Sequence, residues 1–111
     1  MPIIDFQGKQ IEVDDDGYLV NLGDWCEELA GHLAQRDGVM LTDAHWEVIN
    51  FLRNYYSQFQ IAPMVKVLIK ELAKSMGPEK GNNKYLYQLY PGGPAKQACL
   101  YAGLPKPTGC V

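Results

Sequence analysis

The chain has 111 residues and a net charge of −3, and its composition of 47% hydrophobic and 21% charged residues is that of an ordinary globular domain. No segment approaches the roughly 20 apolar residues that span a membrane, and the N-terminus lacks the basic start and apolar run of a signal peptide. These features exclude a membrane protein, and three cysteines without a repeated spacing exclude a disulfide framework, so we expect a cytoplasmic protein with reduced thiols.

Charge is divided unevenly along the chain. Residues 1–60 hold 11 Asp and Glu against 3 Lys and Arg, a net charge of −8, whereas residues 61–111 hold 2 Glu against 7 Lys, a net charge of +5. The basic half carries two of the three thiols, which suits an anionic substrate or an acidic partner surface. Small proteins also divide their charge unevenly by chance, and that alternative stays open.

The first seventeen residues predict a β-hairpin followed by a turn. Residues 3–6 and 10–13 flank a loop that contains Gly8, the arrangement of a short hairpin. Residues 14–17 read Asp-Asp-Asp-Gly, which is typical of a solvated turn.

Apolar residues then recur at helical spacing in three segments. Asp24 is a candidate N-cap for a first helix with the apolar stripe Cys26, Leu29, Ala30 and Leu33. Thr42 is a candidate N-cap for a second helix with the stripe Val48, Phe51, Leu52, Tyr55 and Phe59. Pro63 is well placed as the first residue of a third helix, which Gly77 and the following proline end.

Two shorter helices are predicted over residues 84–89 and 94–102. Together these elements predict a mainly α (α+β) fold, a small orthogonal helical bundle with an N-terminal β-hairpin over residues 1–17. We expect one domain over residues 1–103 and a mobile C-terminal arm over residues 104–111.

Cys99 and Cys110 are the candidate catalytic residues. Gly103 can end the last helix in the left-handed conformation, and Pro105 and Pro107 then hold the chain extended, so the stretch between the thiols is built as an arm. Two thiols on one flexible element favour thiol, disulfide or sulfur-transfer chemistry.

Neither thiol is predicted to be activated by the chain itself. Cys99 lies late in its helix, where the helix dipole opposes a thiolate, although Lys96 one turn earlier favours it. Cys110 is followed by the terminal carboxylate of Val111, which disfavours a thiolate although Lys106 is near. Activation is therefore expected from a basic pocket on a partner.

The remaining cysteine and the histidines predict no site. Cys26 lies on an apolar stripe, so we expect it to be buried and to alkylate most slowly, with Cys110 fastest and Cys99 between them. His32 and His45 have no cysteine or histidine at ligand spacing, so neither a metal nor a cofactor is predicted.

Two other functions are possible on the residues alone. Lys66, Lys70 and Lys74 form a row on the third helix, which together with the second helix could make a DNA-binding helix-turn-helix. Against this, that helix has no Arg, Asn or Gln for base contacts and the chain is acidic, so a nucleic-acid partner is not favoured. A stand-alone enzyme is the weakest alternative because no acid–base pair or cofactor loop is present.

The sequence resembles the DsrC/TusE family over nearly its whole length. The C-terminal segments that carry the resemblance are Lys84-Tyr85-Leu86-Tyr87, Gly93-Pro94-Ala95-Lys96-Gln97-Ala98-Cys99 and Ala102-Gly103-Leu104-Pro105-Lys106-Pro107-Thr108-Gly109-Cys110-Val111. Upstream, Asp16-Gly17-Tyr18-Leu19, His45-Trp46, Phe51-Leu52-Arg53 and Ile61-Ala62-Pro63 are also similar.

The resemblance implies a cytoplasmic sulfur carrier and co-substrate of siroheme-containing dissimilatory sulfite reductase, of which it was first described as the γ subunit, rather than an enzyme. The penultimate cysteine, here Cys110, would hold sulfur as a persulfide, and Cys99 would close a disulfide or trisulfide with it. The implied partners are DsrAB-type sulfite reductase, DsrEFH/TusBCD-type sulfurtransferases and a DsrMK-type membrane reductase. A TusE-like relay for tRNA thiolation is the alternative, but that branch generally keeps only the penultimate cysteine, so Cys99 favours the DsrC branch.

Overall fold

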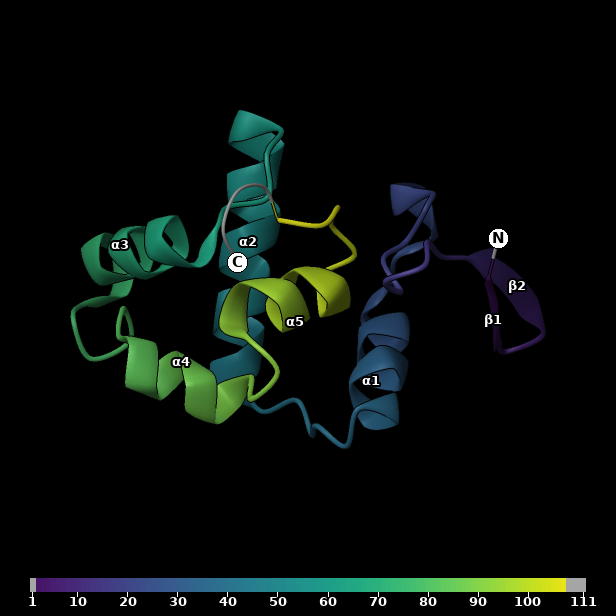
Figure 1. Ribbon diagram of the computed structural model, residues 1–111, viewed down its shortest axis with the longest axis horizontal. Helices are drawn as coiled ribbons and strands as arrows, with labels where there is room; N and C mark the ends of the chain where they lie inside the picture. The colour runs from purple at the N-terminus through teal and green to yellow at the C-terminus, as the bar shows by residue number, and fades with distance from the viewer. Residues whose placement is uncertain (1, 108–111) are drawn as a thin grey trace.

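The computed structural model describes residues 2–107. Within this range the elements are β1 (Ile3–Phe6), β2 (Lys9–Glu12), a 3-10 turn (Leu22–Asp24), α1 (Glu27–Arg36), α2 (Asp43–Phe59), α3 (Val65–Met76), α4 (Asn83–Leu89) and α5 (Pro94–Tyr101). The predicted fold class, a mainly α domain with an N-terminal hairpin, is confirmed (Figure 1).

The hairpin is antiparallel, with Ile3 opposite Glu12 and Phe6 opposite Lys9. Gln7 and Gly8 connect the strands with φ of 52° and 81°, the positive values that a tight two-residue hairpin turn needs. In the predicted turn that follows, the Asp14 carboxylate accepts hydrogen bonds from the backbone N–H of residues 16 and 18, both at 2.9 Å. This turn brings the chain back toward the helical core, where Tyr18 and Leu19 are buried.

Helix α5 is the centre of the domain. It packs against each of the other four helices, and Figure 1 shows it in front of α2, with α1 on one side and α3 and α4 on the other. Most of its residues are buried, namely Pro94, Ala95, Ala98, Cys99 and Tyr101. Small alanines on this helix let its neighbours approach closely, so α5 is a fixed platform for the thiol in its last turn.

Two helix starts differ from the sequence prediction. Asp24 does not cap a helix, because residues 22–24 form a separate 3-10 turn that the Asn21 side chain caps. Helix α1 begins at Glu27 with Cys26 at the N-cap, so Cys26 lies outside the helical stripe and is half-buried rather than buried. Helix α3 begins at Val65, two residues after Pro63, although Gly77 ends it as predicted.

The predicted N-cap of α2, Thr42, is confirmed, and His45 completes its capping box. The Thr42 N–H donates to His45 Nδ1 at 3.1 Å, and the other ring nitrogen, Nε2, hydrogen-bonds the Leu89 carbonyl at 2.7 Å. This arrangement fixes the tautomer, with Nε2 protonated. His45 therefore ties the start of α2 to the end of α4, a structural role.

The chain remains packed on the domain beyond α5. Leu104 is only 3% exposed and belongs to the hydrophobic core, and Pro107 is also buried. The sequence placed both residues in the mobile arm, so the packed part of the molecule extends past the expected boundary at residue 104. Cys110 lies outside the described residues.

Candidate functional site

Cys99 lies in the last turn of α5 and has no exposed surface. Burial raises the pKa of its thiol to about 12, so the sulfur is protonated at neutral pH. The pKa of the neighbouring Tyr18 is also raised to about 12, first by burial and then by the proximity of Cys99. The structure thus supports the prediction that Cys99 is not activated by its own chain, and it adds desolvation as the main cause.

The backbone around Cys99 forms a Schellman motif, a common way to end a helix. The Leu104 N–H donates to the Cys99 carbonyl at 3.0 Å, and the Gly103 N–H donates to the Leu100 carbonyl at 3.2 Å. Gly103 has φ of +71°, the left-handed conformation predicted for it. The motif typically brings the side chains of its first and last residues together, and both Cys99 and Leu104 belong to the same buried cluster.

Two side chains from distant segments bind the remaining carbonyls at this helix end. Trp25 Nε1 donates to the Tyr101 carbonyl at 2.7 Å, and Arg53 Nη1 donates to the Ala102 carbonyl at 2.6 Å. The Arg53 guanidinium also stacks on the Trp25 ring, 3.7 Å from its centroid. We call these two side chains the Trp25–Arg53 cap. Nothing in the sequence pattern singles out Trp25, and Arg53 entered the sequence analysis only through the family resemblance.

A pocket of about 310 Å³ lies beside α5 on the side of Tyr18, and Lys96, Gln97 and Leu100 contribute to its wall. The Tyr18 hydroxyl donates to the Lys96 carbonyl at 3.2 Å. An exposed ion pair between Lys106 and Asp16, at 3.0 Å, crosses from the segment after α5 to the turn before Tyr18. The pocket mixes basic and acidic groups, so it is not a simple anion site.

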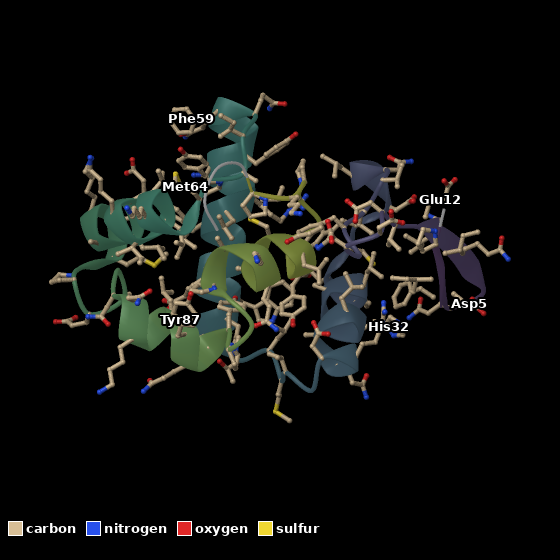
Figure 2. All side chains as sticks on the ribbon, viewed as in Figure 1. Asp5, Glu12, His32, Phe59, Met64 and Tyr87 are labelled. Atoms are coloured by element: carbon tan, nitrogen blue, oxygen red, sulfur yellow. The ribbon has the colours of Figure 1, made fainter. Side chains whose placement is uncertain are left out.

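The other candidate residues lie apart from this site or outside the described range. The exposure of Cys26 and Cys99 is the reverse of the expected order, because Cys26 lies at the N-cap position before α1 while Cys99 lies within the core. His32 packs its ring against Phe6, with centroids 5.4 Å apart, on the side of α1 that faces the hairpin (Figure 2). Within residues 2–107, no group of three His, Cys, Asp or Glu side chains is placed to hold a metal ion.

The lysine row is present as predicted, with Lys66, Lys70 and Lys74 all exposed on α3. On the neighbouring α2, Phe51, Tyr55 and Phe59 stack along the helix, with centroid distances of 6.2 and 4.6 Å. Figure 2 shows Phe59 at the end of α2, where this residue is 58% exposed. None of the helices among the described residues is long and apolar enough to cross a membrane.

Comparisons with known proteins bear on this arrangement. A curated relative named Sulfurtransferase TusE, from Sodalis glossinidius, is 50% identical over 108 residues, which is 97% of this chain and 100% of the relative. The solution structure of Allochromatium vinosum DsrC is 59% identical with a TM-score of 0.87, and the match covers 98% of this chain and 97% of that one.

A crystal structure titled as the oxidized γ-subunit of dissimilatory sulfite reductase (DsrC), from Archaeoglobus fulgidus, is 43% identical with a TM-score of 0.85. This match covers 99% of this chain and 100% of that one. The family model described as DsrC like protein matches residues 5–111. With one family matched in sequence and in fold over nearly the whole chain, this protein belongs to the DsrC-like family, as the resemblance of its C-terminal segments predicted.

Proposed function

We propose that this protein is a sulfur carrier that binds sulfur at Cys110 and uses Cys99 as the second thiol. The observation that carries the proposal is the placement of Cys99: a buried, protonated thiol at the end of α5, eleven residues before the penultimate cysteine. Relatives named sulfurtransferase and DsrC support the same chemistry. The protein works with partners and not as a stand-alone enzyme.

In the proposed chemistry the two thiols react one after the other. The Cys110 thiolate attacks the outer sulfur of a donor's persulfide, and the donor's cysteine leaves as a thiolate. The Cys99 thiolate then attacks the Cys110 sulfur, the bond to the outer sulfur breaks, and hydrogen sulfide leaves as the Cys99–Cys110 disulfide forms. A disulfide that closes about 12 residues restricts the unfolded chain by roughly 3 kcal/mol, so the oxidised form remains reducible by a partner.

The structural relatives favour the dissimilatory branch of this function. The A. vinosum DsrC chain is 59% identical, against 50% for the S. glossinidius TusE, and Cys99 supplies the second thiol that the dissimilatory role needs. In this role the partners are a DsrAB-type sulfite reductase, a DsrEFH-type transferase and a DsrMK-type reductase, all met in the cytoplasm or at its membrane. The TusE-like relay, with a TusBCD-type donor, remains the second candidate because relatives named TusE match 96–97% of the chain at 48–50% identity.

Incubation with a persulfide donor followed by intact mass spectrometry tests the proposal. We expect the wild-type protein first to gain the mass of a sulfur atom and then to lose it as the disulfide forms, Cys110→Ser to gain none, and Cys26→Ser to behave as wild type. Cys99→Ser should load sulfur and keep it, since it cannot release hydrogen sulfide by closing the disulfide. Undiminished loading of Cys110→Ser would reject Cys110 as the carrier residue. Equal loss of sulfur from wild type and Cys99→Ser would favour the TusE-like relay.

A further inference from the structure

Every backbone carbonyl at the end of α5 accepts a hydrogen bond, and two different kinds of donor provide these bonds. A helix leaves its last four carbonyls without partners inside the helix. The Schellman turn binds those of Cys99 and Leu100, and the Trp25–Arg53 cap binds those of Tyr101 and Ala102. The two side chains come from segments 76 and 49 residues away in sequence. The helix end that contains Cys99 is therefore held by the whole domain and not only by its local turn.

The cap is well suited to hold this turn closed. Arg53 is partly buried and burial lowers its pKa, yet an arginine remains charged, so its bond to the Ala102 carbonyl is charge-assisted. Its positive charge also stabilises the negative end of the helix dipole. The Trp25 ring lies directly against Gly103, where an added Cβ would lie 2.6 Å from Trp25 Cγ. Trp25 thus touches both the last turn of α5 and Gly103, the second residue after it.

We infer that Trp25 and Arg53 are positioning residues for Cys99: they hold the last turn of α5 closed, and release of this cap is the step that lets the Cys99 sulfur be reached. The inference deepens the proposed function and rests on it for its biological meaning. Cys99 has no exposed surface, so a reaction at its sulfur requires the packing around the end of α5 to open. The Cys99 carbonyl is bound by Leu104 in the same turn, so opening frees the segment that leads to Cys110 as well.

The inference is tested by measuring the accessibility of Cys99 in a chain that has no other thiol. In the full chain with Cys26→Ser and Cys110→Ser, Cys99 is the single thiol, and its alkylation by iodoacetamide reports how often the turn opens. We expect Arg53→Gln to accelerate this reaction on the order of tenfold to a hundredfold, because a charge-assisted hydrogen bond is lost. Trp25→Phe, which keeps the ring but removes the donor, should accelerate it about fivefold. Arg53→Lys should fall between Arg53→Gln and the unchanged protein.

The control variant is Arg36→Gln, which removes an exposed arginine on α1 and should leave the rate unchanged. The alkylation rate of each variant is compared with its globally unfolded fraction, which urea titration gives. The rate measurements are then repeated at low urea concentrations. If the alkylation rate rises by a larger factor than the unfolded fraction, and depends little on urea, the result supports a local opening that the cap controls. No acceleration, or acceleration that the unfolded fraction accounts for, overturns the inference. Because this background lacks Cys110, a failure of sulfur loading in the earlier experiment would refute the proposed function and leave this result standing.

Discussion

Substituting Gly103 by alanine tests whether the turn after α5 is built around this glycine. Gly103 has φ of +71°, where an L-residue costs roughly 1–2 kcal/mol. Its new Cβ would also lie 2.6 Å from Cγ and 2.7 Å from Cβ of Trp25. These Trp25 atoms lie close to the backbone, and the ring is held by its bond to the Tyr101 carbonyl, so the side chain cannot simply rotate away. Overpacking of this kind costs about 1–3 kcal/mol.

We therefore expect Gly103→Ala to lower the free energy of unfolding by about 2–5 kcal/mol, measured by urea titration with linear extrapolation. Gly38→Ala is the matched control, because Gly38 has φ of +74° but open space around its Cβ position. That variant should lose only about 1–2 kcal/mol, the conformational part. Adding Trp25→Ala should reduce the cost of Gly103→Ala toward that of the control. Equal losses in Gly103→Ala and Gly38→Ala would refute the close packing of Trp25 on this turn.

Three further predictions concern the stability of the domain. Gly31→Ala in α1 should raise the free energy of unfolding by about 0.5–1 kcal/mol, because the helical Gly31 has open space for a Cβ, and thermal melting would show the gain. Tyr90→Phe should lower it by about 1 kcal/mol, because the buried Tyr90 hydroxyl donates to the His45 carbonyl at 2.7 Å; an unchanged urea midpoint would contradict this. Burial raises the pKa of Cys99 and of Tyr18 to about 12, so their contribution to stability is complete below about pH 9 and is lost as the pH rises toward 12. Urea titrations from pH 8 to 11 should show this fall, and Cys99→Ala should make it shallower.

The order and type of the elements could be predicted because local signals agree with the final structure. Thr42 begins α2 and Gly77 ends α3 where the sequence places them, since capping and the breaking of a helix depend on a few adjacent residues. The first helix was placed too early because Asp24 and Cys26 fit both a helix and a 3-10 turn followed by a cap. Only the packing of that turn against the domain decides between them.

The candidate site could be predicted in part. Cys99 as a candidate thiol and the left-handed Gly103 follow from the sequence, because a cysteine late in a predicted helix and a glycine after it are local features. Trp25 and Arg53 could not be assigned a role, since they meet the end of α5 across 76 and 49 residues of chain. The burial of Cys99 was missed for a related reason: α5 has a weak apolar stripe of its own, and its burial comes from four surrounding helices.

The packing of Leu104 and Pro107 links the reach of the chain end to the turn that ends α5 beside Cys99. While these residues stay packed, the three residues from Pro107 to Cys110 extend at most about 10 Å. If the chain is released from Gly103 onward, seven residues extend about 23 Å, enough to enter a buried site on a partner. Withdrawing the Leu104 side chain alone costs about 1.5–3 kcal/mol, so the released form is populated at less than roughly one part in ten and a partner's binding energy has to select it. The same release removes the Leu104 bond to the Cys99 carbonyl and withdraws the Leu104 side chain from the hydrophobic core. Under the proposed function, the motion that delivers Cys110 to a partner therefore also removes a hydrogen bond from the turn that ends α5 beside Cys99.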